Sequence, residues 1–477
     1  MKDSKLVYFL QRLSKEELKD FKAFVDSPLF NRRNSLKTLL SVLIKSDLSK
    51  GPLPSKEEVY SQVYGDQPFN ERSFRTLLAQ MFSLLRQFMA FCQYRNDEVQ
   101  QQLYFLEKLN GTLEEKYFPG YLEKARNAVS TAEHPSSDRH LQLMFLEENN
   151  LLYQLRRPAR LSESNLDQAG HHLLAGFLLR LLRYELQQIN LAGKFKVSAE
   201  HSILRQELIA SVKDQLADLP VEVQVYSNLL QLFRAPEDPV PFFLVRESLS
   251  SSWEEFSRSE GSEIYTLSLN YCARMINRGQ LNFLEQAFEL YVEMLDRALI
   301  TVKGQLSPYH YKNIISVALR LERFDWAQKF IEDWRELIYP DHAQNAFHFN
   351  QGIFHFFRGE FYKASRFFHT VLQDFKDLFY EFDSKGYLLQ IYYETGDTRS
   401  LEALAHSFRV KLGRSEEISD ATREQYLSFI RGLMRLLNIP LNDKERLQKL
   451  KDNVLEKPRK GMGFTWLVDK IDALLAQ

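Results

Sequence analysis

The sequence predicts an all-α protein, and three observations carry this prediction. Glycine supplies only 18 of 477 residues, so few positions suit the tight turns that join the strands of a sheet. Apolar residues recur with a period close to 3.6 along nearly the whole chain. Part of the second half aligns with itself at a shift of 37 residues, which is typical of stacked helical repeats.

The N-terminal block, residues 1–97, begins with clearly marked helices. Two capping boxes open predicted helices, in which a serine and a glutamate three residues later satisfy each other's backbone N–H groups: Ser14 with Glu17, and Ser55 with Glu58. We expect the first helix to end at Asp26 and the second at Gly65. A long amphipathic helix is predicted to start at Asn70, so this block is a small helical domain.

The rest of the chain divides by its breaks and by its self-similarity. Residues 98–250 have the pattern of long helices with weak punctuation, which indicates a diverged array of helical hairpins. Three prolines within residues 234–241 and a polar, serine-rich stretch at 248–262 place a boundary there. Readable repeats occupy 262–412, and residues 413–477 are expected to be C-terminal capping helices.

The repeat is seen most clearly in three segments, 324–327, 361–364 and 398–401, each preceded by an equivalent turn. The aligned turn residues are Glu322, Gly359 and Gly396. The predicted helix pairs are 263–277 with 281–299, 309–321 with 324–337, 346–358 with 361–375, and 379–395 with 399–412.

This pair pattern resembles the tetratricopeptide repeat, in which small residues lie where two helices cross. Ala287, Ala327 and Ala364 stand where the family has its second-helix alanine, and Gly352 matches the small position of the first helix. The period is 37 residues rather than the family's usual length of about 34. The resemblance covers residues 262–412 and implies a right-handed array of antiparallel helical hairpins, an α-solenoid, following the N-terminal domain.

In that family the first helices line a concave groove that holds a segment of a partner protein. Carried over by position, the residues expected in a partner-binding groove here are Tyr309, Lys312, Arg320, Phe349, Asn350, Ile353, Phe356, Phe357, Gln390 and Tyr393. Such a groove would hold an extended or helical peptide with bulky apolar anchors. The other interpretation left open is that many of these aromatic side chains form the core between repeats.

Some members of the family clamp a C-terminal carboxylate between basic and amide side chains. Lys312 and Asn350 occupy two of the clamp positions, whereas Ser316 replaces an asparagine. Asp383 and Tyr387 stand where the clamp needs positive charge. A ligand with a free C-terminal carboxylate is therefore not expected.

The sequence contains no motif for catalysis, cofactor binding or metal binding, so we expect a protein that is not an enzyme and has no cofactor. Two cysteines far apart exclude a disulfide framework, and a formal net charge of −1 does not favour nucleic acid as the partner. The longest apolar stretch, 173–182, is too short to span a membrane, so a cytoplasmic location is expected. The oligomeric state stays open.

An alternative function arises from the N-terminal block. Residues 55–86 resemble the helix–turn–helix of winged-helix transcription regulators, with a recognition helix starting near Asn70. The resemblance implies that Arg72, Arg75 and Arg86 contact DNA. The net charge of residues 1–100 is only +4, from 16 basic and 12 acidic residues, so the electrostatic signal for DNA is slight.

Overall fold

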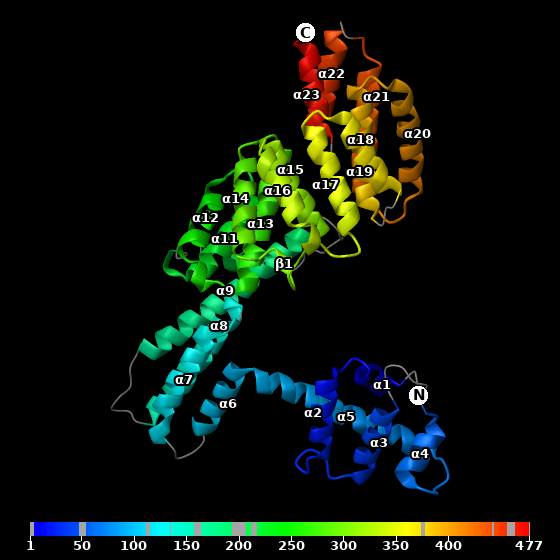
Figure 1. Ribbon diagram of the computed structural model, residues 1–477. Helices are drawn as coiled ribbons and strands as arrows, with labels where there is room; N and C mark the ends of the chain where they lie inside the picture. The colour runs from blue at the N-terminus through cyan, green and yellow to red at the C-terminus, as the bar shows by residue number, and fades with distance from the viewer. Residues whose placement is uncertain are drawn as a thin grey trace. The chain divides into compact units, whose positions relative to one another are not determined.

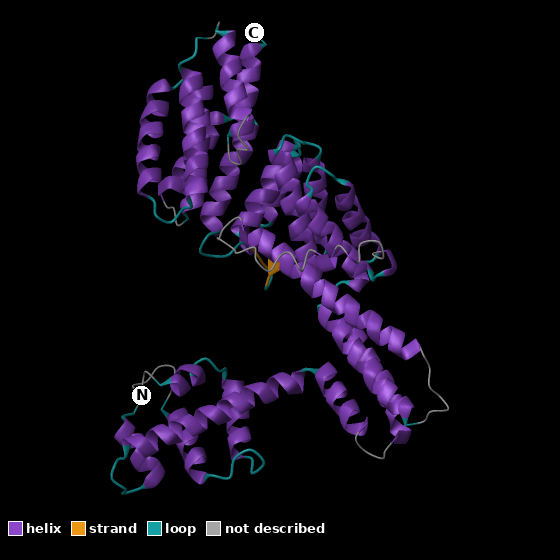
Figure 2. Ribbon diagram, turned by 180° about the vertical axis from the view of Figure 1, so that it is seen from behind, coloured by secondary structure: helices purple, strands orange, loops and turns teal. Residues whose placement is uncertain are grey.

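The protein is described by a computed structural model, which covers residues 4–46, 54–110, 115–133, 135–156, 164–192, 207–209, 211, 217–373, 377–440, 443–455 and 463–476. The prediction of an all-α protein is confirmed, because helices dominate throughout these residues. Within the described ranges the only sheet is a two-stranded antiparallel hairpin, β1 (Thr301–Val302) with β2 (Gln305–Leu306), drawn in orange in Figure 2. Among the described helices, none combines the length and the apolar composition that a membrane-spanning segment needs.

The chain divides into two compact units, one formed by residues 1–132 and 139–173, the other by residues 133–138 and 174–477. The four-part division predicted from the sequence stays a prediction. Figure 1 shows the helices in chain order. Residues 1–132 form α1 (Lys5–Leu10), α2 (Lys15–Asp26), α3 (Asn34–Lys45), α4 (Lys56–Tyr64), α5 (Glu71–Asn96), α6 (Glu98–Asn110), the 3-10 turn η1 (Glu115–Tyr117) and α7 (Phe118–Thr131). Two further helices, α8 (Ser136–Leu155) and α9 (Ser164–Ala192), contain residues of both units.

The helix ends predicted for the N-terminal block are confirmed. Both capping boxes form: the hydroxyls of Ser14 and Ser55 accept from the N–H groups three residues on, and the glutamates there accept from the serine N–H groups. α2 ends at Asp26, and Gly65 ends α4 with a φ of 70°. The Asn70 side chain caps α5. These helices pack around one apolar cluster of α1 to α5.

The second unit continues as a succession of helices. They are α11 (Val221–Arg234), α12 (Val240–Ser251), the 3-10 turn η4 (Trp253–Glu255), α13 (Arg258–Asn277), α14 (Phe283–Asp296), α15 (Pro308–Arg320), α16 (Phe324–Asp333), the 3-10 turn η5 (Arg335–Leu337), α17 (Ala343–Phe357), α18 (Phe361–Gln373), α19 (Leu378–Glu394), α20 (Thr398–Arg414), α21 (Asp420–Leu437), α22 (Lys444–Leu455) and α23 (Phe464–Leu475). One apolar cluster runs from Ala175 to Ile391 and a second from Phe382 to Ile471.

The same backbone turn recurs every 37 residues in this unit. Glu322, Gly359 and Gly396 all adopt left-handed conformations, with φ of 56°, 73° and 70°. In each turn the next N–H donates to the carbonyl five residues back, over 2.9 Å in all three cases. This 6→1 bond closes a helix C-terminus and turns the chain directly into the next helix. The self-alignment of the sequence therefore reflects a recurring backbone conformation.

Small side chains lie where consecutive helices meet. Ala327 and Ala364 are fully buried. A Cβ atom added to Gly352 of α17 would lie 2.7 Å from the ring of Phe368 in α18, which is closer than two carbon atoms can approach. A larger residue at 352 would therefore force α17 and α18 apart.

Three predicted helix C-termini differ from the structure by three residues or more, or lie outside it. α14 stops at Asp296 rather than Leu299, because Ala298 turns the chain with a φ of 51°. α16 stops at Asp333, and the last predicted turn is the separate 3-10 turn η5. The predicted end at residue 375 lies outside the described residues.

Candidate functional site

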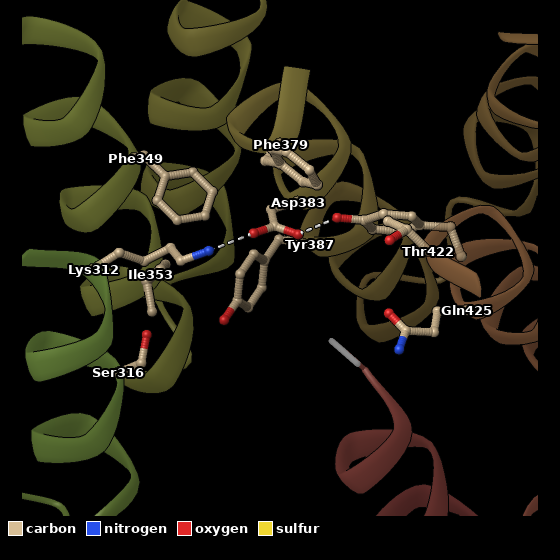
Figure 3. Close-up of a pocket in the computed structure, with 10 residues that line it drawn as sticks. Lys312, Ser316, Phe349, Ile353, Phe379, Asp383, Tyr387, Thr422 and Gln425 are labelled. Atoms are coloured by element: carbon tan, nitrogen blue, oxygen red, sulfur yellow. Dashed lines mark hydrogen bonds and ion pairs between the residues drawn. The ribbon is translucent and has the colours of Figure 1, made fainter. Parts of the chain in front are cut away.

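A pocket of about 390 Å³ lies among the helices α15, α17, α19 and α21. Its walls (Figure 3) are formed by Lys312 and Ser316 of α15, Phe349 and Ile353 of α17, Phe379, Asp383 and Tyr387 of α19, and Thr422, Gln425 and Tyr426 of α21. Residues four apart lie on one face of a helix, so each helix turns one such face toward the pocket. α15, α17 and α19 are the first helices of three successive pairs in the repeat pattern, and α21 follows the last of these pairs.

A hydrogen-bonded ion pair forms the polar centre of the pocket. The Nζ of Lys312 lies 2.9 Å from Oδ2 of Asp383, and the hydroxyl of Tyr426 donates to Oδ1 over 2.7 Å. Figure 3 draws both of these interactions of Asp383 as dashed lines. The side chains of Lys312 and Asp383 are only 22% and 13% exposed, so solvent screens the pair weakly. Burial, and then the negative charge of Asp383, raises the pKa of Tyr426, which therefore stays a donor.

Buried aromatic packing holds the apolar wall of the pocket in place. Phe349 is fully buried and Ile353 is 1% exposed, so each shows the pocket only a small part of its surface. The ring of Tyr387 stacks on Phe368, with 5.1 Å between centroids and 3° between planes. Because these side chains also belong to the core, the wall is preformed rather than assembled by a ligand.

The structure brings three of the ten predicted groove residues into this pocket: Lys312, Phe349 and Ile353. Tyr309 instead donates a hydrogen bond of 2.6 Å to Asp377, and burial, followed by this bond, raises its pKa to about 12. Asn350 and Gln390 are buried, and their amide N–H groups donate to carbonyls one turn back in their own helices.

The remaining four predicted residues lie outside the pocket lining. Phe356 packs edge-on against Tyr387, with centroids 5.0 Å apart. Phe357 is 36% exposed. Tyr393 is half-buried, with its ring 5.5 Å from that of Trp466 in α23. Arg320 is also half-buried, and burial lowers the pKa of its guanidinium.

The sequence did not identify the contribution of α21. Thr422, Gln425 and Tyr426 belong to the segment expected only to cap the array. A signal was present, because Thr422 and Tyr426 are spaced one turn apart and Tyr426 is a bulky residue on that face. The sequence alone could not assign Tyr426 to the groove, because it does not show that α21 lines the pocket together with α19.

The arginines of the alternative site lie on one side of α5. Arg72, Arg75 and Arg86 are all exposed, and at about 100° per residue they fall within about 60° of one another around the helix. Arg75 is partly neutralised, because its Nε lies 2.9 Å from Glu71. No strand is present among the described residues of the first unit to form a wing.

Neither a metal site nor an activated thiol is found in the part of the chain that the structure describes. No group of three or more His, Cys, Asp or Glu side chains in these ranges is arranged to hold a metal ion. Burial raises the pKa of the Cys272 thiol to about 12, which keeps it protonated and unreactive at neutral pH.

Comparison with known proteins gives no assignment: no family model, no curated protein and no solved structure matches this chain.

Proposed function

We propose that this protein is a non-catalytic scaffold or adaptor that binds a peptide segment of a partner protein. The binding groove runs over the faces of α15, α17, α19 and α21 that meet at the pocket. In this proposal the helix pairs form a right-handed array similar to tetratricopeptide repeats, and the groove is its concave side. The observation that carries the proposal is that alternate helices, and not their partners α16, α18 and α20, supply every pocket side chain.

The chemistry of the pocket fits a ligand peptide that inserts one apolar side chain and whose backbone forms hydrogen bonds beside it. Phe379 is 40% exposed and offers apolar surface to the ligand. Lys312 has N–H donors beyond the one used by Asp383, and Gln425 adds a polar amide. Burying one Leu or Phe side chain supplies about 1.5–3 kcal/mol, so useful affinity needs further contacts along the groove.

Asp383 also argues against a ligand with a free C-terminal carboxylate. It already neutralises Lys312, so a second carboxylate would have to displace it and leave Asp383 unpaired in a poorly hydrated site. An internal peptide segment avoids this cost.

A capture experiment with the full chain tests the proposal. Ser316→Phe fills the pocket from α15, and Ser407→Phe adds the same side chain at an exposed position of α20 outside it. We expect the parent chain and Ser407→Phe to retain the same partners, and Ser316→Phe to lose them. Equal capture by all three proteins would reject the groove.

The second proposal is a transcription regulator that contacts DNA through α5 and senses a partner through its repeats. The common exposed side of Arg72, Arg75 and Arg86 favours it. Nuclease treatment during the same capture separates the two proposals. The regulator would be favoured if nuclease removed the binding and the double variant Arg72→Ala/Arg86→Ala abolished it. Ser316→Phe would then leave the binding unchanged.

A further inference from the structure

A second pocket, of about 550 Å³, lies between α20, α21 and α22 and is strongly basic. Its lining consists of Arg409, Arg431, Met434, Arg435, Asn438, Ile439, Arg446, Lys449, Leu450 and Asn453. Five of these ten residues are cationic and none is acidic. Three helices therefore contribute positive charge to the same pocket.

The spacing of these cations conflicts with helix stability. Arg431 and Arg435 stand at i and i+4 of α21, and Arg446 and Lys449 at i and i+3 of α22. Like charges at these spacings destabilise a helix by about 0.2–0.5 kcal/mol per pair. Arg409 of α20 adds a fifth charge. Residues that break a local rule of stability in this way are concentrated at functional sites.

The protein itself neutralises this charge only in part. Arg431 pairs with Glu424, and the Nε of Arg446 lies 3.2 Å from Asp443. Arg409, Arg435 and Lys449 form no ion pair within 4.0 Å with any residue that the structure describes. Three positive charges therefore stay available for a ligand.

The shape and composition of the pocket restrict the class of anion. Four of the five cations are arginines, whose planar guanidinium groups match phosphate oxygens in pairs. The volume falls in the range of small-molecule sites, about 300–1,000 Å³. The lining contains no aromatic ring, so it lacks the stacking surface on which single-stranded nucleic acid binds. These features favour a compact anion over a polymer.

We propose that this pocket binds a small molecule carrying two or more linked phosphate groups. Arg409, Arg435 and Lys449 neutralise its charge, and the apolar side chains of Met434 and Leu450 border the part of the ligand that carries the phosphates. The site is separate from the peptide groove, so either can exist without the other.

Isothermal titration of the full chain with inorganic tripolyphosphate tests this site. We expect one saturable site that is weakened at least tenfold in Arg435→Gln/Lys449→Gln, a loss of about 1.4 kcal/mol or more. The matched control, Arg399→Gln/Arg414→Gln, removes two exposed charges of α20 that do not line the pocket, and should retain affinity within about threefold. Thermal melting confirms that each variant folds.

Two further ligands test which class of anion the pocket prefers. A glutamate-rich peptide of equal charge and a DNA oligonucleotide should each bind more weakly than tripolyphosphate and should not displace it. No saturable binding, an equal loss in the control variant, or displacement by either polymer at the concentration of tripolyphosphate would overturn the proposal.

Discussion

Asp383 holds the polar centre of the groove pocket together. It accepts from Lys312 and Tyr426, which lie 71 and 43 residues away in the sequence. A carboxylate that is only 13% exposed loses most of its hydration. The two donors compensate this desolvation cost, which an unpaired carboxylate would bear in full. The sequence placed both Lys312 and Asp383 on first helices, but it could not show that they pair, because pairing depends on how neighbouring helices stack.

A pair of histidines in the first unit, the buried His140 and the half-buried His172, gives a prediction at the same scale. Nδ1 of His140 lies 3.0 Å from Nδ1 of His172, and burial, followed by the nearby charge of His172, lowers the pKa of His140 to about 4. Between pH 6.5 and 4 the unfolded chain binds a proton there that the folded chain does not. The contribution to stability is complete above pH 6.5 and is lost as the pH falls toward 4.

We therefore expect the unfolding free energy of this unit to fall by about 2 kcal/mol between pH 7 and pH 5 on account of His140. Urea denaturation followed at both pH values measures it. His140→Phe should lose this part of the pH dependence, whereas the exposed control His171→Asn should keep it. The same pH dependence in His140→Phe as in the parent chain would show that the titrating group lies elsewhere.

The repeated turn is the clearest feature at the scale of the element. It lets one short sequence pattern end a helix and start the next, at Glu322, Gly359 and Gly396. A residue with a Cβ atom is strained by about 1–2 kcal/mol in the left-handed region, whereas glycine is not. Glu322 is therefore the strained member of the three.

Glu322→Gly should raise the free energy of unfolding by about 0.5–1 kcal/mol, and Gly359→Ala should lower it by about 1 kcal/mol. A Cβ at Gly359 meets no atom within 4 Å, so its cost comes from the backbone alone. Urea denaturation of the two variants beside the parent chain measures both changes. A loss of stability in Glu322→Gly would mean that the glutamate side chain, not the turn, matters at this position.

Helix positions were predictable where local chemistry decides them. The capping boxes at Ser14 and Ser55 and the glycine at 65 act within four residues, so their helix ends follow from the sequence alone. The ends of α14 and α16 were placed too late, because the left-handed conformation of Ala298 and the 3-10 turn η5 depend on tertiary packing.

At the scale of the whole chain, the register of the pocket changes along the array. From α15 to α17 the pocket residues follow the 37-residue period, since Lys312 aligns with Phe349 and Ser316 with Ile353. In α19 the corresponding pocket residues Asp383 and Tyr387 come only 34 positions after Phe349 and Ile353. The period would instead place Gln390 there, which is why the sequence selected Gln390.

The first helices lengthen from 13 to 15 to 17 residues along the chain, while the turns that follow them keep their period. The two extra residues of α19 lie at its N-terminal end and amount to about half a turn, whereas its pocket residues fall three positions earlier than the alignment predicts. Repeat spacing in sequence fixes the turns, but the residues that face a groove depend on helix length and tilt, which only the packed structure provides.

The most direct measurement for the account as a whole is selection from a displayed peptide library on the immobilised full chain, followed by titration of the enriched peptides. We predict peptides with bulky apolar residues, bound at least about tenfold more weakly by Ser316→Phe and by Gln425→Trp, which fill the pocket from α15 and α21. Ser407→Phe should bind them as the parent chain does. Enriched peptides that bind all four proteins equally would contradict the claim that this pocket is the recognition site.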